Sequence, residues 1–280
     1  MGMIKRIRQE QDDNRKTEKT KNTSAGLKIR VWTVCLTLAV CAVYACANTA
    51  VTAATGKREL PVYRVARQDG QIAISFDAAW GGDKTKKILD ILDEYEVKTT
   101  FFLVDIWTQR FPELVKEIDA RGHEIGNHST SHPQMSRLSA EKIADELDTM
   151  SDNVYALIGK RPVLFRPPYG DYNNRLIVTA RSLGYTPIQW SVDSLDWKNR
   201  GRDDLVRRAT ENVQSGDIVL FHNDSDFIVD ALPLVLESYR EKGLTVVPVS
   251  RLLPEGDAVI DNQGTLREAT PNPTKIPEVE

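Results

Sequence analysis

The chain of 280 residues is predicted to fold as an α/β domain built on a parallel sheet or barrel, preceded by one apolar segment. Three observations predict this class. From about Leu60 onward, short apolar runs alternate with amphipathic runs of helical spacing, and the connections are short. The length allows one large domain of this type. Residues 31–56 contain no charged side chain, which sets this segment apart from the rest of the chain.

The charge distribution excludes one class of partner. The net charge is −3, so no overall basic field exists for nucleic acid, and no nucleic-acid partner is expected. Residues 1–30 carry nine Lys/Arg against four Asp/Glu, and residues 254–280 carry two against six. We therefore expect a basic cytoplasmic arm at 1–30 and a polar, acidic, extended tail at 254–280, where four of the thirteen prolines lie.

The uncharged segment 31–56 is long enough to cross a bilayer, and basic residues directly precede it. It predicts a single-pass membrane anchor, with the following domain outside the cytoplasm. A cleaved signal peptide competes with the anchor, because Ala45-Cys46-Ala47 resembles a cleavage site. A lipoprotein cysteine at Cys41 or Cys46 is a weaker alternative. The domain after it, placed at 57–253, contains no cysteine.

The first half of this domain opens with two strands and then alternates helix and strand. Asp69-Gly70 is a turn signal, so the runs beside it predict a hairpin or two short strands. Asp83 is expected to cap the next helix, and Gly122 suits the end of a later one. The expected elements are strands 61–67 and 71–76, helix 83–95, strand 98–104, helix 111–120 and a short strand 123–128.

The second half continues the same alternation. Ser139 opens a helix that runs to about Ile158, before Gly159. Repeated strand-then-helix units favour parallel strands. The remaining expected elements are strand 163–165, helix 174–183, strand 185–192, helix 202–213, strand 217–222, helix 228–242 and strand 244–249.

Polar or ionisable residues follow five of the expected strands. In parallel α/β folds the chemistry gathers at the carboxyl ends of the strands, so five such endings predict one site there. The five segments are Ser75-Phe76-Asp77, His128-Ser129-Thr130-Ser131-His132, Arg166-Pro167-Pro168-Tyr169-Gly170, Asp193-Ser194-Leu195-Asp196-Trp197 and Leu220-Phe221-His222.

Taken alone, His128 and His132 are as well explained by a metal site as by a role without metal. His128 and His132 are four apart, so on a helical turn both imidazoles would face one ion. His123 and His128 look like the zinc-protease motif H-E-x-x-H, but one extra residue separates them. His123 is therefore expected to be a capping or structural residue. Asp193 is as well explained by a backbone bond in its turn as by a direct role.

Together these motifs resemble polysaccharide deacetylases with the NodB homology domain, carbohydrate esterase family 4. The resemblance runs from about Ile72 to Leu253, with five motifs in family order, and FDAAWG resembles the membrane-anchored sporulation-type branch. It implies a distorted (β/α) barrel that removes N-acetyl groups from cell-wall glycans. Peptidoglycan amino sugars are the expected substrate, a role in spore or wall construction is implied, and no protein partner is expected.

The resemblance also implies roles for individual residues. Asp77 corresponds to the catalytic base, and Arg166 to the arginine that orients it. His128 and His132 correspond to ligands of a divalent metal, zinc in the first instance, with cobalt, manganese or nickel as alternatives. His222 corresponds to the general acid. The other implied residues are Asp196 and Trp197 beside that acid, Tyr169 as an oxyanion donor through its backbone N–H, Leu220 in the acetyl pocket, and Trp80 along the glycan groove.

These residue types suit amide hydrolysis, which needs a polarised carbonyl, an activated water and a protonated leaving amine. A glycosidase would need two opposed carboxylates instead. One departure stands out: the family usually has two adjacent aspartates, the second a metal ligand, and here Ala78 follows Asp77. We expect Asp77 or Asp83 to replace that ligand, or the metal to bind more weakly. The alternative function is a weakly active or inactive glycan-binding protein with the same fold.

Overall fold

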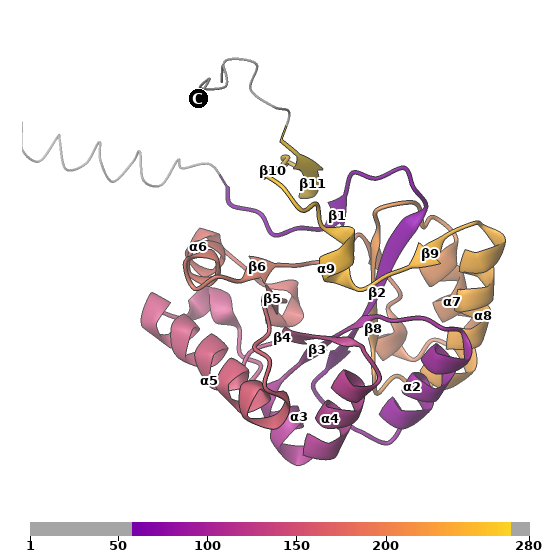
Figure 1. The fold of residues 1–280 in the computed structure, drawn as a ribbon, viewed down its shortest axis with the longest axis horizontal. Helices are drawn as coiled ribbons and strands as arrows, with labels where there is room; N and C mark the ends of the chain where they lie inside the picture. The colour runs from indigo at the N-terminus through magenta and orange to yellow at the C-terminus, as the bar shows by residue number, and fades with distance from the viewer. Residues whose placement is uncertain (1–57, 270–280) are drawn as a thin grey trace, which may run out of the picture. The chain divides into compact units, whose positions relative to one another are not determined.

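The computed structural model describes residues 58–269, which belong to one compact unit (Figure 1). Within this range no helix is long and apolar enough to span a bilayer. The predicted arm at 1–30 and membrane segment at 31–56 lie outside the described residues.

A curved sheet of parallel strands forms the centre of the domain, with β2 near its middle. The strand order is β6-β5-β4-β3-β2-β8-β7, and β9 pairs with β2 off this path. The predicted parallel α/β barrel type is confirmed. The strands are β2 (Gln71–Ala78), β3 (Thr100–Leu103), β4 (Glu124–Asn127), β5 (Leu164–Phe165), β6 (Thr186–Pro187), β7 (Val192–Asp193), β8 (Ile218–His222) and β9 (Thr245–Val246).

Helices cover the outside of this sheet, following one another around it (Figure 1). Two of them, α3 and α9, lie in segments for which the sequence predicted no helix. The helices are α2 (Thr85–Glu94), α3 (Asp105–Arg110), α4 (Pro112–Ala120), α5 (Ala140–Ile158), α6 (Asn174–Ser182), α7 (Arg202–Thr210), α8 (Ile228–Glu241) and α9 (Val249–Leu252). Short 3₁₀ turns occur at Met135–Arg137, Pro168–Gly170 and Asp196–Lys198.

Strand β2 shows how the sheet separates core from site. Ile72, Ile74 and Phe76 belong to the large apolar cluster that includes the helices, and Phe76 stacks between Phe101 and Phe221. Because side chains alternate along a strand, Ser75 and Asp77 project to the other side. Every residue of β2 after Gln71 is buried, as expected for a strand covered on both faces.

A second, three-stranded sheet decides between two alternatives and corrects one prediction. Strand β1 (Arg64–Val65) pairs with β11 (Thr265–Glu268), so the runs beside Asp69-Gly70 are two separate strands and form no hairpin. Strand β10 (Ala258–Ile260) pairs antiparallel with β11. The prediction of an extended tail from residue 254 is therefore wrong as far as residue 268. A turn ending at Gly264 closes this hairpin, and Leu266 and Ile260 pack on a second apolar cluster.

Two local expectations also differ from the structure. Helix α2 begins after Lys84 without a side-chain cap, so Asp83 is not the predicted cap. The single strand expected over 185–192 is two short strands, β6 and β7, because β6 pairs with β5 and β7 pairs with β8 at opposite ends of the strand order. In contrast, Ser139 caps α5 as predicted, and Gly159 ends it in the left-handed conformation.

Candidate active site

The site forms where β2 and its neighbours end. Asp77 and His222 are register partners on the adjacent parallel strands β2 and β8, so their side chains leave the same edge of the sheet. Leu220 lies two residues before His222 and therefore on the same face of β8. Asp196 and Trp197 lie in a 3₁₀ turn that contacts β8.

Asp77 forms a buried ion pair with Arg166. The guanidinium Nη1 donates to Asp77 Oδ1 at 2.7 Å, and Nη2 donates to the backbone oxygen of Gln189. The guanidinium also lies 4.0 Å from the ring centroid of Phe102. Burial alone would raise the pKa of Asp77, but the charge of Arg166, with a smaller contribution from His222, holds it below its usual value. Asp77 is therefore an ionised carboxylate with a fixed orientation.

The tautomer of His128 is set by its surroundings. Its Nδ1 lies 2.7 Å from the backbone oxygen of Arg166, and because a carbonyl only accepts, Nδ1 carries the proton. Burial lowers the pKa of His128, so the ring is neutral and Nε2 presents a lone pair. This Nε2 lies 3.4 Å from Asp77 Oδ2. The arrangement resembles that of a metal-ligating imidazole held by a backbone carbonyl.

His132 reaches the same place by a different local structure from the one predicted. Residues 128–132 form a loop after β4, with Ser129 at φ 72° and His132 at φ 56°, and they form no helical turn. The His132 ring still lies 5.0 Å from the His128 ring and 4.4 Å from the Tyr169 ring. Burial lowers the pKa of His132 to about 4, and its buried Nδ1 has no hydrogen-bond partner in the described structure.

The ring nitrogens of His128 and His132 fit a metal site of two imidazole ligands. Among residues 58–269, no three His, Cys, Asp or Glu side chains gather as a metal-binding group. Asp77 Oδ2 lies 3.4 Å from His128 Nε2, and the replacement of the missing ligand by Asp77 or Asp83 stays a prediction. Ala78 is fully buried and belongs to the apolar cluster beneath the helices. The neutral His128 with a free Nε2 and the unpartnered His132 are the groups that could hold a divalent ion.

His222 and Asp196 form the second charged pair. His222 Nδ1 lies 2.7 Å from Asp196 Oδ1, and the His222 backbone N–H donates to Asp196 Oδ2 at 2.7 Å. Burial would lower the pKa of His222, but the hydrogen bond and charge of Asp196 raise it above its usual value. A protonated His222 is the state that a general acid needs.

Exposed aromatic side chains lie around these groups. Trp80 is 66% exposed, Tyr169 64% and Trp197 56%, whereas Leu220 is buried. The Trp80 ring lies 6.3 Å from the His132 ring. Tyr169 has a φ of 61°, an unusual backbone conformation for a residue with a side chain. The roles that the resemblance implies for these four residues remain predictions.

The site also contains polar residues that no sequence motif pointed to. Asn223 directly follows His222 and is buried, and its side chain donates to the backbone oxygen of Gly81 and to Thr85 Oγ1. Glu146 of α5 binds the loop between the histidines. A single polar residue has no periodic signal in the sequence, so only its contacts identify it.

Asp193, which the sequence motifs did single out, accepts from the N–H of Leu195. This is the turn role that was weighed for it.

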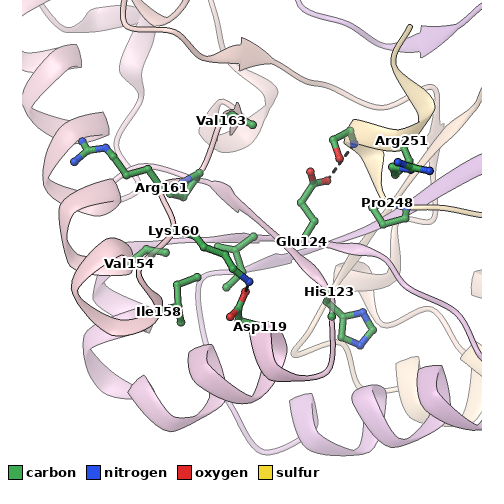
Figure 2. A pocket seen from close by; sticks show the side chains of 14 residues that line it. Asp119, His123, Glu124, Val154, Ile158, Lys160, Arg161, Val163, Pro248 and Arg251 are labelled. Carbon is green, nitrogen blue, oxygen red and sulfur yellow. Dashed lines mark hydrogen bonds and ion pairs between the residues drawn. The ribbon is translucent and has the colours of Figure 1, made fainter. Parts of the chain in front are cut away.

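A separate cavity of about 280 Å³ lies at the opposite, amino ends of β4 and β5 (Figure 2). Glu124, the first residue of β4, and Lys160 and Arg251 line it. His123 borders it and accepts from the N–H of Thr99, in agreement with its expected structural role. None of the predicted catalytic or metal-binding residues lines this cavity.

Comparison with known proteins identifies the family. A polysaccharide deacetylase profile matches residues 64–188. A peptidoglycan-N-acetylglucosamine deacetylase from Bacillus cereus is 37% identical over 196 residues, which cover 68% of this chain and 92% of the relative. The chain belongs to the polysaccharide deacetylase family. An uncharacterized Bacillus subtilis protein, YlxY, is 32% identical, and the match covers 70% of this chain but only 61% of that protein.

Solved structures of this family have the same fold. PdaA from Bacillus subtilis, a family 4 carbohydrate esterase, superposes with a TM-score of 0.66 at 30% identity, covering 69% of this chain and 84% of that one. A CE4-family pseudoenzyme from Bacillus anthracis superposes with a TM-score of 0.67 at 30% identity, covering 75% of this chain and 73% of that one. The deacetylase fold is therefore shared with an enzyme family and with a pseudoenzyme.

Proposed function

We propose that this deacetylase-family chain removes N-acetyl groups from cell-wall peptidoglycan. One observation carries the proposal: an ionised carboxylate paired with Arg166 and an imidazole paired with Asp196 end neighbouring strands. A glycan-binding module would need neither a matched base nor a matched acid. Relatives named as peptidoglycan deacetylases support the substrate class.

The residues divide the reaction between them. Asp77 takes the proton of the attacking water, and Arg166 keeps its carboxylate ionised and oriented. His222 gives its proton to the amine as the carbon–nitrogen bond breaks, and Asp196 keeps the imidazole protonated. We assign the backbone N–H of Tyr169 to the oxygen that becomes negatively charged. Leu220 lines the acetyl pocket, and Trp80 and Trp197 contact sugar rings.

We further propose that His128 and His132 hold a divalent ion, zinc before cobalt, manganese or nickel. Such an ion polarises a carbonyl and makes water more acidic. Since Ala78 supplies no ligand, the affinity of the site for the ion should be lower than that of a three-ligand site, by about 10–100-fold or more.

A second candidate is a catalytically weak or inactive glycan-binding protein. Two observations favour it: Ala78 lies in the apolar cluster where the family usually has an aspartate ligand, and a similar structure is described as a pseudoenzyme. The aromatic rings of Trp80, Tyr169 and Trp197 would serve sugar binding without chemistry.

Acetate release from purified peptidoglycan and from chitin oligomers distinguishes the two candidates. The full chain is compared with Asp77→Asn and His222→Ala, with Asp145→Asn on the exposed part of α5 as the control. The enzyme predicts release by the full chain and the control, and loss of about 100-fold or more in the two site variants. Equal release by all four proteins would refute it.

The location is also a proposal. We infer that residues 31–56 anchor the chain in a bacterial membrane with its catalytic domain outside, or that it is secreted after cleavage near Ala47. The basic residues before an uncharged segment support the anchor. The FDAAWG motif supports a role in spore or wall construction. Cell fractionation with amino-terminal sequencing of the mature chain decides between anchor and secretion.

A further inference from the structure

The loop that joins the two site histidines adopts an unfavourable backbone. Ser129 and His132 both have positive φ, at 72° and 56°, a region that residues with side chains rarely occupy. Such conformations persist only where the surrounding contacts determine them. His132 nevertheless keeps its ring 5.0 Å from that of His128. Something outside the loop must therefore hold it.

Glu146 of helix α5 makes four hydrogen bonds with this loop. Its Oε2 accepts from the backbone N–H of Thr130 at 2.9 Å and from that of Ser131 at 2.8 Å. Its Oε1 accepts from Ser131 Oγ at 2.6 Å, and its backbone oxygen accepts from Thr130 Oγ1 at 2.8 Å. A carboxylate bound to two successive backbone N–H groups forms strong, charge-assisted hydrogen bonds.

The rest of the loop is bound to β4, to the start of α3 and to itself: the N–H groups of Asp105 and Ile106 donate to the backbone oxygens of Ser129 at 3.0 Å and of Thr130 at 3.2 Å. Asn127 Oδ1 accepts from the N–H of Ser129 at 2.8 Å, and Ser129 Oγ accepts from the N–H of His132 at 3.0 Å. The Asn127 side chain is itself bound to α5, through the backbone oxygen of Leu147 and Ser151 Oγ. Helix α5 thus fixes both ends of the turn, and Glu146 holds the two residues that directly precede His132.

We propose that Glu146 is a positioning residue that fixes His132 beside His128 and so preorganises the two-imidazole site. The inference rests on the proposed ligand role of His132. Glu146 touches neither imidazole, so it acts only through the backbone of the loop. Without its carboxylate, the loop loses three of the hydrogen bonds that hold the positive-φ conformation, so the separation of the two imidazoles is less well defined.

The test compares Glu146→Gln and Glu146→Ala with Asp145→Asn in the full chain in detergent. Asp145 is the exposed neighbour on the same helix and carries the same charge. Hydrogen exchange at Thr130 and Ser131 is measured, together with Co²⁺ affinity from the absorbance of the bound ion. A hydrogen bond to a charged group corresponds to roughly ten- to hundredfold in an equilibrium constant.

We expect exchange at these two amides to accelerate at least about tenfold in Glu146→Ala and less in Glu146→Gln. Co²⁺ affinity should fall about 10–100-fold. Asp145→Asn should change neither. Ser131→Ala, which removes a single contact, should give an intermediate effect and remains informative if Glu146→Ala does not fold.

Unchanged exchange in both Glu146 variants, or altered exchange with unchanged Co²⁺ affinity, overturns the proposal. Absence of Co²⁺ binding by the unsubstituted chain refutes the ligand role of His132 separately.

Discussion

Replacing Asp196 with asparagine tests the proposed acid directly. The Asp196 carboxylate is buried and accepts two hydrogen bonds from His222, one from its ring and one from its backbone, each 2.7 Å long. Asparagine has the same shape but no charge, and its amide nitrogen would face an N–H donor. The variant therefore removes the two largest effects that raise the pKa of His222, and it leaves the smaller ones of Asp77 and Asp193 and the burial that lowers it.

The size of the change follows from these contacts. A hydrogen bond to a charged group contributes about 1.5–3 kcal/mol, and one pKa unit corresponds to about 1.36 kcal/mol. The pKa of His222 should therefore fall by about 1–2 units in Asp196→Asn. Because the acid must be protonated, activity is lost as pH rises through this pKa, so the alkaline limb of the profile should move to lower pH by the same amount.

The same linkage affects stability. The folded-state pKa of His222 lies above its ordinary value near 6.5, so the pair stabilises the folded chain most below that pH. This contribution is lost as pH rises through the folded-state pKa. The assay is acetate release from peptidoglycan between pH 5 and about pH 10, with the His222 pKa followed by NMR. Asp193→Asn removes a nearby charge without breaking the pair, so a smaller shift is expected. An unchanged alkaline limb in Asp196→Asn would refute the reasoning.

Three further predictions concern the metal, the base and the substrate. Ala78→Asp places a carboxylate among apolar side chains, so the free energy of unfolding in EDTA should fall by roughly 2–5 kcal/mol, and the melting temperature with it. Zinc should raise the melting temperature of this variant more than that of the unsubstituted chain. Equal zinc shifts would count against a third ligand at this position. Gly126→Ala puts a Cβ 2.4 Å from the Phe102 ring, which packs on Arg166. Thermal unfolding should therefore show a free energy of unfolding lower by about 1–3 kcal/mol, and activity should fall. In the control Gly256→Ala, the added Cβ meets nothing within 4 Å, so both should be unchanged. Trp80→Ala should raise KM for long glycans about tenfold, as expected for about 1–1.5 kcal/mol of ring stacking, without changing the melting temperature; an unchanged KM would remove Trp80 from the substrate groove.

Much of the fold could be read from periodicity and turn signals. The alternation of strand and helix predicted the parallel sheet, and Ser139 and Gly159 marked both ends of the longest described helix. Predictions failed where distant segments compete for the same partners. Strand β1 pairs with β11, some 200 residues away along the chain, because both cover one apolar cluster with Val62 and Leu252. No local pattern at residues 61–67 contains that information.

The sequence by itself determined which reactive groups the chain carries and that they follow successive strands. It also showed that alanine stands at position 78, because identity and order are properties of the chain. Only the tertiary structure decided which groups meet. It paired Asp77 with Arg166 and His222 with Asp196, and it shaped the histidine turn through Glu146. These pairings depend on strand register and on side-chain contacts across the sheet, and such contacts set both the protonation states and the orientations that the chemistry needs.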